Sequence, residues 1–111
     1  MSKKAVLVVH TTYTIHPEDK QIFTNAVLSH ISATRKTEGN VYYHFSWDMV
    51  DPNTCVLAEG WVNQKAIDDH LKSEMFQAAL KAVIEHVRIL ERHGTLYTVS
   101  GETDIIPETT N

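Results

Sequence analysis

The sequence lacks the features that mark several large classes of protein. Its single cysteine, Cys55, excludes an internal disulfide, and its place in an apolar stretch predicts a buried, inert thiol. The apolar run at residues 5–9 is too short for a signal sequence or a membrane span. The sequence contains no Gly-rich phosphate loop, dinucleotide fingerprint or nucleophile turn. We therefore expect a cytoplasmic protein without a membrane partner and without a bound nucleotide or flavin cofactor.

Positive charge is also scarce. Ten basic residues stand against 14 acidic ones, the net charge is −4, and no long block of lysine or arginine occurs. This balance argues against a nucleic-acid partner. The seven histidines form no HExxH motif, no His-x-His pair and no pairing with cysteine. The sequence therefore predicts no metal site.

What remains is the composition of an ordinary globular domain. The chain has 111 residues, of which 42% are hydrophobic and 22% charged. This length corresponds to one domain. We place that domain at residues 1–100, followed by a polar, acidic tail at 101–111 that is loosely held or acts as an exchange arm.

The spacing of apolar residues predicts four strands and two helical regions. The strands are expected at 5–13, 41–49, 55–62 and 95–100; one helix starts at Pro17 and ends near Gly39, and a second helical region starts at Gln64, is split at Ser73 and ends at His93-Gly94. The order is β-α-β-β-α-β. This order predicts an α+β, ferredoxin-like fold with an antiparallel sheet and helices on one face.

Aromatic and titratable residues are predicted to meet at the end of the third strand. Glu59 and Trp61 lie two residues apart and so share one face of that strand. Asn63 can cap the short helix that follows, whose inner stripe carries His70 back towards Trp61. Converging groups of this kind are what a small-molecule pocket needs. Its further walls are expected to come from Tyr43, Phe45, Leu57 and Phe76.

Each of these residues also has a purely structural interpretation. Trp61 and Phe76 could fill the core, and Tyr43 could pack with its hydroxyl at the rim. Glu59 could pair with a lysine or cap a helix. His70 could be a half-buried histidine with satisfied nitrogens. The sequence leaves both interpretations open.

The opposite face of the sheet predicts a partner. Val56, Ala58 and Gly60 present a small, flat, apolar surface, and the first strand is apolar on both faces. Helices cover only one face, so an uncovered apolar face would cost stability and solubility. We therefore expect a two-fold homodimer with the two sheets face to face.

Several short motifs together resemble the antibiotic biosynthesis monooxygenase (ABM) domain, in particular its quinol-monooxygenase-like members. The resemblance covers residues 5–100 and rests on Gly39 to Tyr43, the acidic turn at Asp51-Pro52, Glu59-Gly60-Trp61, Ala66 with His70, and Ser73 with Phe76. No single motif is specific. Their spacing within the β-α-β-β-α-β order carries the resemblance. His16-Pro17-Glu18 stands where family members commonly show a Pro-Gly turn.

The resemblance implies a dimeric α/β barrel with a pocket between helices and sheet in each subunit. It also implies oxygenation of quinols or polyketide phenols without metal or flavin. In that chemistry His70 or Glu59 would be the base, Tyr43 or the Trp61 indole N–H would donate a hydrogen bond, and Trp61 and Phe76 would sandwich the ring.

Two alternatives to this chemistry stay open. One is a binding module that holds a small hydrophobic molecule without converting it. The other is haem binding and degradation, which a related branch of the family performs. That branch uses an asparagine in the first strand, and residues 1–24 contain no asparagine.

Overall fold

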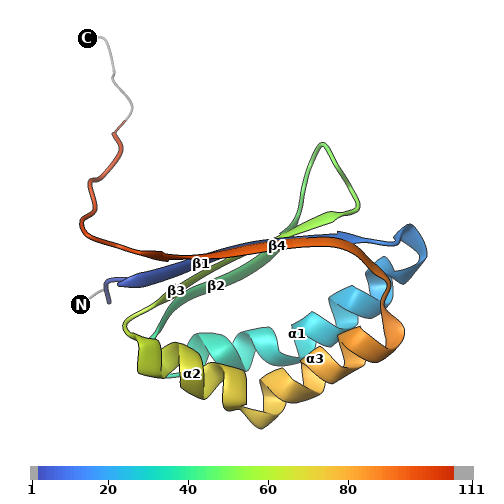
Figure 1. Ribbon diagram of the computed structural model, residues 1–111, viewed down its shortest axis with the longest axis horizontal. Coiled ribbons are helices and arrows are strands. Elements are labelled where there is room, and N and C mark those ends of the chain that lie inside the picture. The colour runs from blue at the N-terminus through green and yellow to red at the C-terminus, as the bar shows by residue number, and fades with distance from the viewer. Residues whose placement is uncertain (1–2, 107–111) are drawn as a thin grey trace.

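The computed structural model describes residues 3–106, and in it three α-helices cover one face of a four-stranded sheet (Figure 1). The elements in chain order are β1 (Leu7–Ile15), a short 3₁₀ helix η1 (Pro17–Asp19), α1 (Lys20–Lys36), β2 (Asn40–Trp47), β3 (Thr54–Trp61), α2 (Gln64–Lys72), α3 (Glu74–His86) and β4 (Ile89–Thr98). The strand order is β2-β3-β1-β4, and every neighbouring pair is antiparallel. The predicted α+β, ferredoxin-like fold is confirmed.

Register assigns each strand residue to one face of the sheet. Trp61 pairs with Leu7 and Glu59 pairs with Val9, so these side chains point to the helices together with Tyr43, the partner of Glu59 on β2. The alternation expected from the sequence is therefore present. Trp61 is fully buried and Tyr43 nearly so, which places the centre of the core beneath β2 and β3.

Caps fix the helices that carry the candidate site. The Asn63 side chain accepts a hydrogen bond of 2.8 Å from the Ala66 amide at the start of α2. Ser73 accepts one of 3.2 Å from the Phe76 amide at the start of α3, while its hydroxyl donates to the His70 carbonyl. The predicted split at Ser73 is confirmed, because this residue ends one helix and begins the next.

The predicted end of the second helical region is wrong. The helix was expected to continue to His93-Gly94, but α3 ends at His86 and β4 already begins at Ile89. β4 pairs with β1 at nine positions, with one register shift near Ile15, and without this pairing β1 would be an open sheet edge. His93 therefore lies on a strand and not on a helix.

The start of α1 is tied to the beginning of β4 by an ion pair. The Asp19 carboxylate accepts hydrogen bonds from the backbone amide and the guanidinium of Arg88, at 2.8 and 2.9 Å. These hydrogen bonds lower the pKa of Asp19 to about 2. The pair joins two segments 69 residues apart in the chain and closes one end of the helical layer.

The face of the sheet away from the helices is open and mixed in character. On it lie Val8, Val56, Ala58, Tyr42 and Tyr97, with His10, His44 and His93 between them. The first strand was expected to be apolar on both faces, but beyond Val8 its outer face is polar. The loop at residues 48–53 and the segment after β4 both leave the sheet on this side (Figure 1). Their apolar side chains, Met49, Val50, Ile105 and Ile106, are all largely exposed.

Residues 101–106, the described part of the predicted tail, form no helix or strand and are exposed. The rest of that tail, 107–111, lies outside the described residues. Among residues 3–106, no helix combines the length and the apolar character needed to cross a bilayer.

Candidate active site

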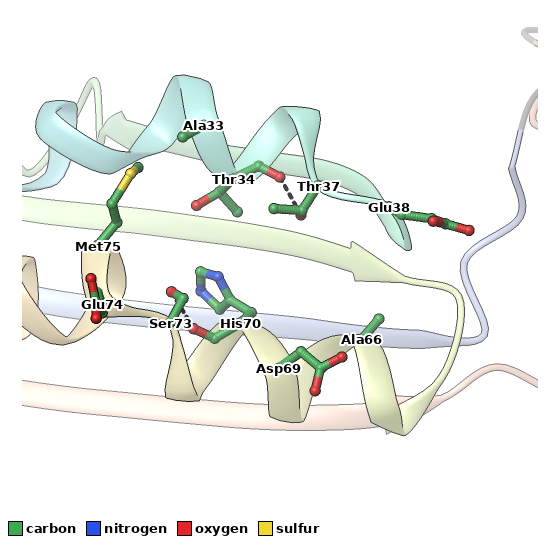
Figure 2. Close-up of a pocket in the computed structure, with 10 residues that line it drawn as sticks. All are labelled: Ala33, Thr34, Thr37, Glu38, Ala66, Asp69, His70, Ser73, Glu74 and Met75. Atoms are coloured by element: carbon green, nitrogen blue, oxygen red, sulfur yellow. Dashed lines mark hydrogen bonds between the residues drawn. The ribbon is translucent and has the colours of Figure 1, made fainter.

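Two cavities lie next to the helical layer. The first, which we call the inter-helix cavity, has a volume of about 370 Å³ and lies between α1 and α2, where His70 borders it (Figure 2). The second, which we call the sheet–helix cavity, has a volume of about 500 Å³ and lies between the sheet and the helices α1 and α3. Both volumes suit a small organic molecule.

The sheet–helix cavity has mostly apolar and aromatic walls. Four of the residues that the sequence predicted for substrate binding line it: Tyr43, Phe45, Leu57 and Phe76. Leu71, Leu80, Val83 and Ile84 of α2 and α3 form the wall opposite the sheet. A planar aromatic molecule would therefore meet rings on several sides and few polar groups.

His70 projects from α2 towards α1 (Figure 2). It is only 6% exposed, and neither ring nitrogen makes a hydrogen bond within residues 3–106. Burial lowers the pKa of His70 to about 4, and the nearby His30 adds to this lowering. At neutral pH the imidazole is therefore uncharged, with a nitrogen able to accept a proton.

Aromatic rings surround His70. Its ring centre lies 4.7 Å from that of Phe76, 4.9 Å from Trp61 and 5.3 Å from Tyr43. Phe76 and Tyr43 line the sheet–helix cavity, whereas His70 lines the inter-helix cavity. These rings therefore form part of the wall that separates the two cavities.

His30 belongs to the same wall and was not predicted from the sequence. Its Nε2 lies 2.8 Å from the Tyr43 hydroxyl, a hydrogen bond that either ring tautomer can form. Burial lowers the pKa of His30 and raises the pKa of Tyr43. Nδ1 is buried without a hydrogen-bond partner in the described part of the chain. The His30–Tyr43 pair is therefore neutral.

His30 stands three residues after Val27 and seven after Phe23, a helical spacing that could have placed it on the inner stripe.

Glu59 and Trp61 contact each other directly. The indole Nε1 of Trp61 donates a hydrogen bond of 3.1 Å to Glu59 Oε1. Burial raises the pKa of Glu59, and this hydrogen bond partly offsets the increase. Neither residue borders the two cavities. In this arrangement Glu59 fixes the indole, and the indole packs against His70.

Metal binding has little support in the described residues. Nowhere in 3–106 do three or more histidine, cysteine, aspartate or glutamate side chains lie close enough together to hold an ion. His10 and His44 share the outer face, but Ala58 of β3 lies between them in the sheet.

The comparisons with known proteins point to one family. The sequence profile described as antibiotic biosynthesis monooxygenase matches residues 6–82, which is more than half of the chain. This chain belongs to the antibiotic biosynthesis monooxygenase family. The matched region contains β1 to β3, α1, α2 and most of α3, and so includes the wall around His70.

Solved structures of ABM proteins share the fold. A "putative antibiotic biosynthesis monooxygenase" from Deinococcus radiodurans is 22% identical, with a TM-score of 0.81 over 90% of this chain and 98% of its own. A protein with the same description from Nitrosomonas europaea is 18% identical, with a TM-score of 0.78 over 86% and 99%. A third, described as an antibiotic biosynthesis monooxygenase, is 25% identical, with a TM-score of 0.72 over 91% and 99%. No curated protein matches the sequence.

Proposed function

We propose that this protein is a cofactor-independent monooxygenase that acts on a small aromatic substrate of the quinol or phenol type. The observation that carries the proposal is the wall around His70, where a neutral imidazole with unpaired nitrogens lies among aromatic rings beside a cavity of about 500 Å³. Membership of the ABM family supports the reaction class.

The substrate ring occupies the sheet–helix cavity with its hydroxyl directed at this wall. His70 does not itself line this cavity, so proton transfer requires the Phe76 ring, which lines the cavity and lies 4.7 Å from the His70 ring, to turn aside. His70 then accepts the phenolic proton, because its uncharged ring has a free lone pair. The resulting phenolate is electron-rich enough to react with O₂. One oxygen atom then enters the ring and the other leaves as water, so that a quinol plus O₂ gives a hydroxyquinone plus H₂O. The apolar walls keep solvent away from the reactive intermediate.

Glu59 and Trp61 have supporting parts in this proposal. Glu59 holds the indole N–H, and the indole in turn limits the positions that the His70 ring can take. Glu59 also remains the second candidate base, since burial favours its protonated form and so raises its affinity for a proton.

Oxygen uptake tests the proposal. We expect uptake above the uncatalysed rate with a panel of hydroquinones, naphthoquinols and anthrones. His70→Gln should lower the rate about a hundredfold, the typical contribution of a positioned base. His86→Gln, an exposed histidine at the end of α3, is the control and should keep the wild-type rate.

Circular dichroism must show that each variant keeps the fold. Uptake by the wild type that never exceeds uncatalysed oxidation across the panel would contradict the proposal. An unchanged rate in His70→Gln would remove His70 as the base.

A second candidate is a binding module that holds a small hydrophobic molecule without turnover. One observation favours it: the Trp61 indole N–H donates to Glu59 and is not free to stabilise an oxyanion. Native mass spectrometry distinguishes the two functions. A co-purifying aromatic ligand that survives aerobic incubation unchanged indicates binding alone, and its oxygenated product indicates catalysis.

We also propose that the protein is a homodimer joined through the outer face of the sheet. The half-buried Val8, Val56 and Ala58 lie on that face, and the exposed apolar side chains of two protruding segments flank it. Such an arrangement would cover the apolar surface on both copies at once.

A further inference from the structure

Arg92 lies at the mouth of the sheet–helix cavity. It stands opposite Tyr13 in the β1–β4 register, so its side chain leaves the sheet on the helix side. Its guanidinium carbon lies 5.9 Å from the centre of the Tyr13 ring, and both residues line the cavity. Arg92 is exposed while the rings behind it are buried or half-buried. The guanidinium is therefore positioned between solvent and the aromatic interior.

The position of the Arg92 guanidinium depends on Gly94. A Cβ on Gly94 would lie 3.2 Å from Arg92 Nη2 and 3.2 Å from Oγ1 of Thr11. These distances are tighter than side chains normally tolerate, so a larger residue would push the guanidinium away. Because position 94 has no side chain, Nη2 of Arg92 lies along β4 over Gly94.

Arg92 is the arginine at this end of the sheet whose charge is not neutralised by a carboxylate of the described residues; its partner there is the Tyr13 phenol, whose pKa Arg92 lowers against the larger effect of burial. Arg88 pairs with Glu18 and Asp19, and Arg35 bonds the Tyr43 carbonyl and His44. Arg92, in contrast, forms no ion pair with any carboxylate within residues 3–106.

Apart from the Tyr13 phenol, the described groups at the cavity do not engage this charge. The neighbouring acid on β4, Glu91, pairs with His93. Among the described residues that line the sheet–helix cavity, Arg92 alone carries a charge at neutral pH, since burial keeps His30 neutral. The Gln77 amide, the other polar group on the α3 side of the mouth, is engaged by the Leu71 carbonyl.

We propose that Arg92 binds the carboxylate of an aromatic acid whose ring fills the sheet–helix cavity. A guanidinium offers two parallel N–H donors that match the two oxygens of a carboxylate. The cavity behind it supplies the apolar and aromatic walls for the rest of the molecule. This inference rests on the proposed function for the presence of an aromatic ligand, and it adds the class of ligand.

The geometry also orients the ligand. With its carboxylate on Arg92 at the mouth, the other end of the ring system points to the wall formed by His30, Tyr43 and Phe76. The substrate class is therefore an aromatic acid with its reactive hydroxyl remote from the carboxylate. A neutral quinol of the same size would lack this anchor.

A matched pair of probes tests the proposal without turnover. The first is 6-hydroxy-2-naphthoate and the second is its neutral amide, 6-hydroxy-2-naphthamide. Both are titrated anaerobically into the wild-type protein, Arg92→Gln, Arg92→Lys and the control Lys36→Gln, with heat or tryptophan fluorescence as the signal. Lys36→Gln removes the same charge from the exposed end of α1, outside the lining of the cavity.

We expect the wild-type protein to bind the acid at least about tenfold more tightly than the amide, which corresponds to about 1.4 kcal/mol. Arg92→Gln should lose this preference and bind the amide as before. Arg92→Lys should keep part of the preference for the acid, and Lys36→Gln should keep all of that preference. Raising the salt concentration should weaken acid binding only where Arg92 is present.

Equal affinities for the two probes in the wild type would overturn the proposal, as would equal losses in Arg92→Gln and Lys36→Gln. Failure of either probe to bind at millimolar concentration would overturn it as well. These experiments also distinguish failure of this proposal from failure of the proposed function. A preference for the acid together with no oxygen uptake leaves Arg92 as the anchor of a binding protein, and oxygen uptake without that preference removes Arg92 and leaves the oxygenase.

Discussion

His30 and His70 face each other across the wall between the two cavities, with ring centres 6.4 Å apart. Both lie among aromatic rings, and burial lowers the pKa of each. Protonation of either ring would place a positive charge in an apolar environment. That charge would also disfavour protonation of the other ring. Without a bound ligand both imidazoles of the wall are therefore uncharged at neutral pH, and each has a lone pair that can accept a proton.

This burial makes the stability of the protein depend on pH. In the unfolded chain a histidine takes up a proton near its usual pKa of 6.5, whereas folded His70 does so near 4. Between these values the unfolded state binds more protons, so the free energy of unfolding should fall as the pH falls from about 6.5 to 4. The loss from His70 is at most about 3 kcal/mol, and His30 adds a loss in the same direction.

Urea unfolding at a series of pH values measures this effect. His70→Gln should unfold with a shallower pH dependence than the wild type in this window, because the glutamine cannot take up a proton. A variant with the wild-type slope would show that the pH dependence originates elsewhere.

At the scale of single residues, the sequence predicted the positions of some side chains correctly and missed others. The common face of Glu59 and Trp61, with His70 approaching it, followed from strand alternation and helical periodicity. The hydrogen bonds did not follow, because they depend on side-chain rotamers: the indole could donate to a ligand, yet it donates to Glu59. Arg92 was missed because the helix before it was extended too far, and a residue assigned to a helix end has no register against Tyr13.

At the scale of elements, α2 is held at both ends by features that are visible in the sequence. Asn63 and Ser73 cap its limits, and both caps were predicted. Its packing against the end of α1 depends on Gly39, which has a φ of +93°. A Cβ on Gly39 would lie 2.6 Å from the Ala66 Cβ in the first turn of α2. The close approach of the segment after α1 to the first turn of α2 therefore requires glycine at this position.

Gly39→Ala should destabilise the protein for two reasons. The left-handed backbone costs an alanine about 1–2 kcal/mol, and the overlap with Ala66 adds about 1–3 kcal/mol. Urea unfolding should thus show a loss of roughly 2–5 kcal/mol. The double variant Gly39→Ala/Ala66→Gly removes the overlap, so its loss should be smaller than the sum of the two single losses. A single variant within about 0.5 kcal/mol of the wild type would contradict this account.

The boundary between α3 and β4 shows where local patterns stop being informative. Val83, Val87 and Leu90 have helical spacing, and this spacing extended the predicted helix. The structure assigns the last part of that stretch to β4, because β1 would otherwise be an open edge. Pairing between strands more than 70 residues apart is a tertiary effect that a short sequence window does not contain.

On the scale of the whole molecule, the proposed dimer through the outer face of the sheet predicts the mass of the protein in solution. Sedimentation should give twice the mass of the 12.6 kDa chain at micromolar concentration. Ala58→Lys puts a charge at the centre of the outer face and should weaken association at least about tenfold, because a buried, unpaired charge is strongly unfavourable. Leu28→Lys, on the exposed side of α1, is the control and should remain dimeric.

A wild-type mass near 12.6 kDa would contradict the proposed dimer. An Ala58→Lys variant that still sediments as a dimer would place the interface on another surface. Circular dichroism of each variant separates loss of association from loss of folding.

Gly60 lies between Glu59 and Trp61 on β3, and its outer surface is covered by Tyr42, whose ring occupies the space of a side chain at that position. Trp61, the next residue, packs against His70 on the inner surface. A single strand is thus the only layer between the proposed contact of two copies and the wall of the cavity. Occupancy of the cavity and association of the two copies would then be thermodynamically linked, and such linkage acts equally in both directions. A ligand whose binding stabilises the wall would lower the dissociation constant of the dimer. Dissociation into monomers on dilution would raise the dissociation constant for the ligand by the same factor.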